Sequence, residues 1–197
     1  EENAEGRRNQ VVSGRIPHPR KMAFHSKIIL IMEISIKSLV LFGAVVLTGL
    51  SAGLFYAWSV SVIPGTQKIS DSTYLQTMQS INRAILNPAF FLIFFGSIVA
   101  LGLASIYEYP SNTWRFMLLL VASVTYLVGT IGVTGLGNVP LNDQLDVFKI
   151  AESSPEKIAE FRAYYESKWN RLHLFRTVFA VGSFLLALLA LFVDAKN

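Results

Sequence analysis

The stretch PEKIAEFRAYYESKWNRLHLFRTVFAVGSFLLALLALFV, residues 155–193, decides the fold, because it joins a charged helix to a long apolar run without a break. Ser154 suits the cap of a helix, Pro155 suits its first turn, and no further glycine or proline occurs before Gly182. We therefore expect one helix over 155–193, about 58 Å long at a rise of 1.5 Å per residue. Its second half, 172–193, is apolar enough to cross a membrane, and its first half must extend beyond the bilayer.

The composition is that of a membrane protein. The chain has 197 residues, of which 52% are hydrophobic and 15% charged, and its mean hydropathy is +0.46. A soluble domain carries about 25% charged residues. The absence of cysteine excludes disulfides, thiolate catalysis and thiolate metal ligands. The net charge of +4 lies largely in residues 1–38, beside the first apolar run, so we expect no nucleic-acid partner.

Three further apolar runs precede the long helix, at 39–63, 88–107 and 116–136, and each is long enough to cross a hydrocarbon core of about 30 Å. The connection at 108–112 is short, so the second and third spans must form an antiparallel hairpin. Together with the span in 172–193, these runs predict an all-α fold, a bundle of four transmembrane helices.

Small residues recur every four positions along the first two spans, and such faces let membrane helices pack closely. They are Gly49, Gly53 and Ala57 in the first span and Gly96, Ala100 and Ala104 in the second. These faces predict packing inside the bundle. If they are exposed, they favour a homo-oligomer or association with a partner subunit.

The connection at 64–87 contains a further helix. Ser70 or Asp71 can cap it, and its apolar stripe consists of Tyr74, Met78, Ile81 and Ile85. We expect an amphipathic helix in this first outer loop, lying on the bundle or folded into its mouth.

Residues 1–31 are predicted to be a disordered or interfacial extension and 32–197 the transmembrane domain, with Met22 and Met32 both plausible as the natural start. Lysine and arginine are concentrated before the first span, which predicts cytoplasmic N- and C-termini and both long loops, 64–87 and 137–171, on the outer face. We expect the chain to lie in a lipid bilayer, the cell (inner) membrane.

A polar stripe lies just before the last apolar run. At about 100° per residue, Trp169, His173 and Arg176 share one face of the helix. Ionisable groups at a membrane boundary are costly unless they face protein or water, which indicates a functional site. The alternative is an interfacial anchor, with the tryptophan in the aromatic belt and the charged groups reaching for lipid headgroups.

The topology brings further polar side chains to the same end of the bundle. The candidate site residues are Asn82, Asn87, Asn138, Asn142, Trp169, Asn170, His173 and Arg176. Convergent polar groups at the mouth of an apolar bundle favour a pocket for a lipophilic small molecule. Amides orient a ligand, an imidazole exchanges a proton near neutral pH, and a guanidinium stabilises an anion. The asparagines on either side of Pro140 are equally typical of a turn.

Other chemistries find less support in the sequence. There is no glycine-rich phosphate loop before a helix and no convincing Ser-His-acid arrangement. Of the three histidines, His18 and His25 are expected on the opposite side of the membrane from His173, which disfavours a haem, copper or other metal site. The apolar runs contain no aspartate or glutamate, which disfavours a proton-coupled carrier.

Several short motifs, in order along the chain, resemble those of one known family. They are GLFYAWSV at 53–60 with Pro64, INR at 81–83, Asn87-Pro88, NVPLN at 138–142 and WNRLH at 169–173 with Arg176. In their order and spacing they are similar to the anthrone oxygenase-like family of small four-helix membrane proteins. The resemblance covers about Met32 to Val193.

This resemblance implies a monooxygenase that oxidises anthrones to anthraquinones with molecular oxygen and without a recognised metal, flavin or other cofactor. On that basis we hypothesise that His173 is the base, that Arg176 with Asn138 and Asn142 holds the oxyanion, and that Trp169 stacks on the ligand. Two alternatives stay open, a non-enzymatic membrane subunit or small-molecule-binding protein, and a carrier or channel.

Overall fold

The computed structural model describes residues 35–109 and 111–193, and the regular structure in them is entirely helical. The predicted extension at 1–31, the candidate starts at Met22 and Met32, and His18 and His25 lie outside the described residues.

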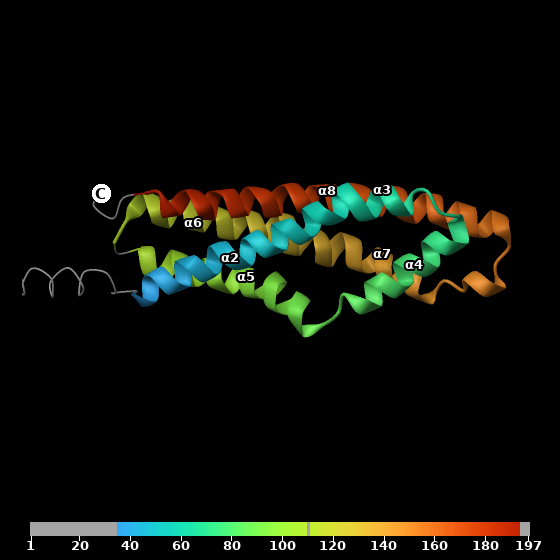
Figure 1. Cartoon of the computed structure of the whole chain (residues 1–197), viewed down its shortest axis with the longest axis horizontal. Helices are drawn as coiled ribbons and strands as arrows, with labels where there is room; N and C mark the ends of the chain where they lie inside the picture. Colours follow the sequence, from blue (N-terminus) through green and yellow to red (C-terminus); the bar gives the residue numbers. More distant parts are fainter. Residues whose placement is uncertain (1–34, 110, 194–197) are drawn as a thin grey trace, which may run out of the picture. The chain divides into compact units, whose positions relative to one another are not determined.

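Four helical stretches are long and apolar enough to cross a membrane, and the chain is an integral membrane protein in contact with lipid. They are Ile36–Thr66, Pro88–Glu108, Thr113–Val147 and Pro155–Leu191. The predicted all-α bundle with four membrane spans is therefore confirmed, with the third and fourth stretches longer than the apolar runs alone indicated (Figure 1).

The first and third spans are each divided by segments of π-helix, whose wider turns hydrogen-bond residues five apart. The first consists of α2 (Ile36–Ala57), η1 (Trp58–Val62) and α3 (Ile63–Thr66). The third consists of α6 (Thr113–Thr125), η2 (Tyr126–Gly132), η3 (Thr134–Asn138) and α7 (Val139–Val147). The second and fourth are the single helices α5 (Pro88–Glu108) and α8 (Pro155–Leu191).

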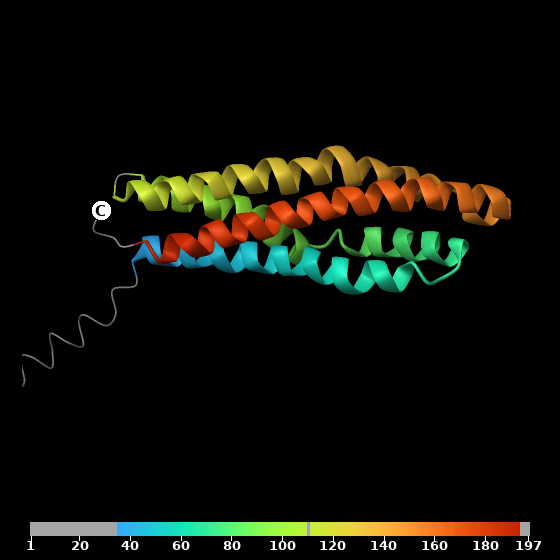
Figure 2. The ribbon, with the colours of Figure 1, turned by 90° about the horizontal axis from the view of Figure 1, so that it is seen from above.

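The four spans pack in a ring in which α8 lies between α2 and α6, and α5 closes the other side (Figure 2). The closest approach is at Gly129, where an added Cβ would lie 2.0 Å from Cγ of Phe179. Two of the predicted small-residue positions also serve this packing, because Gly49 meets the ring of Phe184 and Gly96 meets Leu47. By contrast, an added Cβ at Gly53 would meet nothing within 4 Å.

The interpretation of Asn138–Asn142 as a turn is wrong, since the helix continues through it as η3 and α7. The backbone amide of Val139 donates to the carbonyl of Thr134, which is the five-residue spacing of a π-helix. Pro140 lies near the start of α7, which continues directly from η3.

The long fourth helix forms as predicted from Pro155, with the side chain of Ser154 accepting from the amide of Lys157. The amphipathic helix is confirmed as α4 (Asp71–Ala84), capped by Ser70. Its buried face is formed by Tyr74, Leu75 and Met78, which pack on α7 and on the part of α8 before the last apolar run.

Arg162 of α8 binds the start of α4. Its Nη1 donates to the carbonyl of Ile69 at 2.7 Å and to Oδ1 of Asp71 at 2.8 Å. Its guanidinium also lies 4.5 Å from the ring centre of Tyr74, and burial raises the pKa of that tyrosine. The connection between α3 and α4, and with it the start of α4, is thus held against α8. The 3₁₀ turn η4 (Ile150–Glu152) joins α7 to α8.

Candidate functional site

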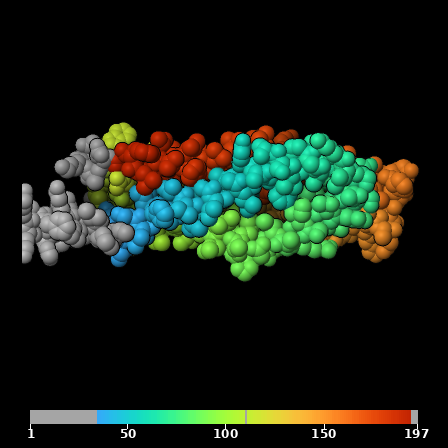
Figure 3. All heavy atoms as spheres, in the orientation of Figure 1, coloured from blue at the N-terminus to red at the C-terminus, as the bar shows by residue number. Residues whose placement is uncertain are grey.

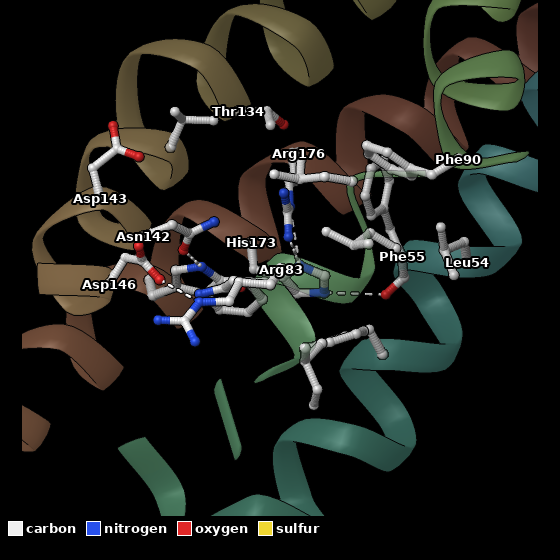
Figure 4. A pocket seen from close by; sticks show the side chains of 17 residues that line it. Leu54, Phe55, Arg83, Phe90, Thr134, Asn142, Asp143, Asp146, His173 and Arg176 are labelled. Atoms are coloured by element: carbon white, nitrogen blue, oxygen red, sulfur yellow. Dashed lines mark hydrogen bonds and ion pairs between the residues drawn. The ribbon is translucent and has the colours of Figure 1, made fainter. Parts of the chain in front are cut away.

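A cavity of about 240 Å³ lies where α4, the α4–α5 corner (residues 85–87) and α7 meet the bundle (Figure 4). Five of the predicted site residues line it, namely Asn82, Asn142, Trp169, His173 and Arg176. These five residues come from three separate segments of the chain, α4, α7 and α8.

His173 and Arg176 are buried inside the protein, at 1% and 8% exposure, rather than directed at lipid headgroups. Arg176 donates to Nδ1 of His173 from Nε at 3.0 Å and from Nη2 at 2.9 Å. On the other side of the ring, Nε2 lies 3.1 Å from the carbonyl oxygen of Phe55 and 3.0 Å from Oγ of Ser59.

These contacts determine the tautomer of His173. A guanidinium only donates, so Nδ1 must be the acceptor, and the carbonyl of Phe55 only accepts, so the proton lies on Nε2. The imidazole is neutral and both of its nitrogens have partners. The indole of Trp169 covers one face of it, with ring centres 5.0 Å apart and planes 6° from parallel.

Arg176 is a buried cation without a carboxylate partner among the described residues. Its guanidinium lies 4.7 Å from the ring centre of Phe55 and 5.0 Å from that of Trp169, which is cation–π geometry. Within the same part of the chain, Nη1 has no hydrogen-bond partner. Burying an unpaired charge is costly, so this arrangement suits a ligand that supplies a negative oxygen.

Asn142 organises the polar wall of the cavity. Its Oδ1 accepts from the hydroxyl of Tyr165 at 3.0 Å and from Nε1 of Trp169 at 2.9 Å. Tyr165 in turn accepts from Nδ2 of Asn82 at 3.1 Å. Nδ2 of Asn142 has no partner in the described residues, which leaves one amide donor for a ligand.

The other three predicted residues do not line the cavity. Asn87 caps α5 by accepting from the amide of Phe90. Asn138 is fully buried between η3 and α8, where its Nδ2 donates to the carbonyl of Trp169 at 3.3 Å. Its Oδ1 has no partner among the described residues. Asn170 is half-buried on α8.

The sequence prediction missed residues that complete the site. Ser59 and Phe55 hold the imidazole, and Trp58 lines the cavity with its ring centre 5.9 Å from that of Trp169. All three lie at or just before the π-helical segment η1. The π-helix leaves no mark in the composition of this apolar run, and Ser59 is one of several hydroxyl residues along it.

The cavity has an apolar side and a polar side. Figure 4 shows Leu54, Phe55 and Phe90 on one side, and Asn142, Asp143, Asp146 and Arg83 on the other. The site therefore combines a hydrophobic slot with a buried cation. Within the described part of the chain, no group of three His, Cys, Asp or Glu side chains is placed to hold a metal ion.

The fold and site define a four-span integral membrane protein with a mostly apolar cavity between its helices. The model of the anthrone oxygenase family matches residues 88–186, and the chain belongs to that family. The match covers α5 to most of α8, including Asn142, Trp169, His173 and Arg176. No curated protein and no solved structure matches the chain significantly.

Proposed function

We propose that the protein is a cofactor-independent oxygenase that acts on a lipophilic, anthrone-like aromatic in the cavity. Anthrone and molecular oxygen give anthraquinone and water. The methylene carbon loses both hydrogens and gains one oxygen atom, and the second oxygen atom leaves in the water. The observation that carries the proposal is Arg176, a buried guanidinium beside an apolar slot with no carboxylate partner among the described residues.

Binding of such a substrate would use both sides of the cavity. The flat rings lie against Leu54, Phe55 and Phe90, and the oxygen faces Nη1 of Arg176 and Nδ2 of Asn142. Loss of a methylene proton turns the ligand carbonyl into an oxyanion, which a guanidinium in a dry site stabilises far better than water does. The same loss makes the carbon electron-rich enough to pass an electron to oxygen.

His173 is the proposed base, acting together with Arg176. Its Nδ1 lone pair is held by the guanidinium. When Arg176 turns toward the oxyanion of the ligand, that lone pair becomes free to take the proton. Ser59 and the carbonyl of Phe55 keep the ring in place at Nε2. Oxyanion formation and release of the base are thereby coupled.

Oxygen uptake by the purified protein with anthrone tests this proposal. We expect uptake above the uncatalysed rate, and a loss of about 100-fold or more in Arg176→Gln, the size of effect that removal of one oxyanion donor has. His173→Gln should show a similar loss. Arg171→Gln is the matched control, because Arg171 is an exposed cation on the same helix. Equal uptake in all four proteins would contradict the proposal.

The second candidate is a non-enzymatic protein that binds lipophilic aromatic anions. It is favoured by the fact that both ring nitrogens of His173 already have partners. Binding of an anthraquinone without any oxygen uptake from anthrone would identify this function. In either case we propose that the site lies at the outer face of a cell membrane and that both termini are cytoplasmic, because lysine and arginine are concentrated before the first span.

A further inference from the structure

The cavity opens on one side of the bundle, between α2 and the α4–α5 corner. Figure 3 shows a hollow there, with α8 at its base. The cavity-lining residues on this side are all apolar, namely Leu54, Trp58, Ile81, Ile85 and Leu86.

Leu86 forms the rim of this opening, since it lines the cavity and is 65% exposed. On the facing helix, Leu50 is 54% exposed one turn before Leu54. The corner lies directly before Pro88, where the second membrane span begins, and Leu54 belongs to the first span. The opening is therefore at the edge of the hydrocarbon region, where exposed leucines contact lipid at no cost.

The opposite side of the cavity is polar. Nε of Arg83 on α4 donates to Oδ1 of Asp146 on α7 at 2.7 Å. The two side chains are 64% and 52% exposed, and charged side chains this exposed must face water. The cavity thus has a lipid-facing opening on the α2 side and an ion pair across the water-facing side.

We propose that the cavity takes its ligand, a flat, uncharged polycyclic molecule dissolved in lipid, from the bilayer through the opening between α2 and the α4–α5 corner, past Leu86 at the rim. The inference rests on the proposed function only in taking this cavity as the ligand site. Such molecules concentrate in hydrocarbon because burial of their apolar surface is favourable. Lateral entry also spares the ligand a passage through water past Arg83 and Asp146.

Capture of anthracene by the protein in liposomes tests this route. Anthracene is flat and uncharged and has no ionisable oxygen, so its capture depends neither on an oxyanion site nor on oxygen chemistry. A Trp114→Phe background leaves Trp58 and Trp169, which both line the cavity, as the remaining tryptophans. Energy transfer from them to anthracene, after rapid mixing, reports arrival in the cavity.

We expect Leu86→Phe to slow capture about tenfold by crowding the opening, and Leu86→Ala to accelerate it. A faster variant also shows that the altered protein is folded. Leu92→Phe is the matched control, because Leu92 has nearly the same exposure, 64%, but lies outside the cavity. Asp146→Asn, which weakens the water-side ion pair, should leave the rate unchanged.

Two outcomes would overturn the inference. One is a wild-type protein that does not capture anthracene. The other is capture that is insensitive to both Leu86 variants, or that is accelerated by Asp146→Asn alone. Neither outcome bears on oxygen uptake with anthrone, which is measured separately and by itself decides the proposed function.

Discussion

Arg176 and His173 lie one turn apart on α8 and form a single buried unit, in which the guanidinium donates to Nδ1 of the imidazole at 3.0 Å from Nε. The acceptor that holds Arg176 is thus a neutral ring, which leaves the positive charge uncompensated by any described carboxylate. A charge of this kind is suited to a ligand oxyanion.

Removal of one partner of this unit should lower the stability of the protein more than removal of both. We expect His173→Phe to lower stability by about 1–3 kcal/mol, because it leaves buried donors of Arg176 unsatisfied. In the double variant with Arg176→Met, part of that loss should be recovered. Thermal unfolding in detergent of the two single variants and the double variant measures the coupling. Strictly additive losses would show that the two side chains do not act together.

Asn142 should contribute to stability through its side-chain oxygen, which accepts hydrogen bonds, and not through its volume. Asn142→Leu leaves the hydroxyl of Tyr165 and Nε1 of Trp169 without their acceptor, so a loss of about 1–3 kcal/mol is expected for each unsatisfied donor. Asn142→Asp keeps an oxygen at Oδ1 and should be milder. The apparent unfolding midpoints of the two variants make the comparison. A leucine variant as stable as the wild type would contradict this account of the polar wall.

The sequence predicted most of the architecture, because each element had a strong local signal. The apolar runs predicted the spans, Ser154-Pro155 predicted the start of α8, and Ser70 predicted the start of α4. These signals act over a few residues, through caps and hydropathy, and do not depend on the rest of the fold.

The features that the sequence did not predict depend on contacts between segments that lie far apart in the chain. Asn138–Asn142 has the composition of a turn, but the helix continues through it from π-helix into α-helix, and composition does not disclose this continuation. The pairing of Ser59 with His173 joins residues far apart in sequence, so no periodicity within one helix could predict it. The polar stripe left a buried site and an interfacial anchor both open, and the packing of α8 against α2 is what buries His173 and Arg176.

Among the glycines of the bundle, Gly129 should tolerate substitution by alanine least. In Gly129→Ala the new Cβ would lie 2.0 Å from Cγ and 2.4 Å from Cβ of Phe179, so the helices must move apart. We expect a loss of about 1–3 kcal/mol or more from such overpacking. Gly43→Ala is the matched control, since its Cβ would meet nothing within 4 Å. Unfolding midpoints that fall equally in both variants would contradict the packing described here.

Arg162 should be irreplaceable by lysine. A single ammonium cannot reproduce the fork that reaches Ile69, Asp71 and Glu166 together. In Arg162→Lys we expect faster amide hydrogen exchange at the α3–α4 connection and the start of α4, with exchange in α5 unchanged. Arg83→Lys is the comparison, because Arg83 makes one exposed ion pair, which contributes less than about 1 kcal/mol. Unchanged exchange in α4 of the Arg162 variant would show that these contacts of Arg162 are not required to hold α4.

The most direct test of the central claim is the absorption spectrum of a bound hydroxyanthraquinone whose hydroxyl is remote from its carbonyls. Such a dye absorbs at longer wavelength when ionised, and the product-like ring system is not consumed. If Arg176 is an oxyanion site, the wild-type protein will bind the dye as the phenolate at a pH where the free dye is neutral, and Arg176→Gln will bind it as the phenol. A dye that stays neutral in the wild type, or that ionises equally in both proteins, would contradict the claim.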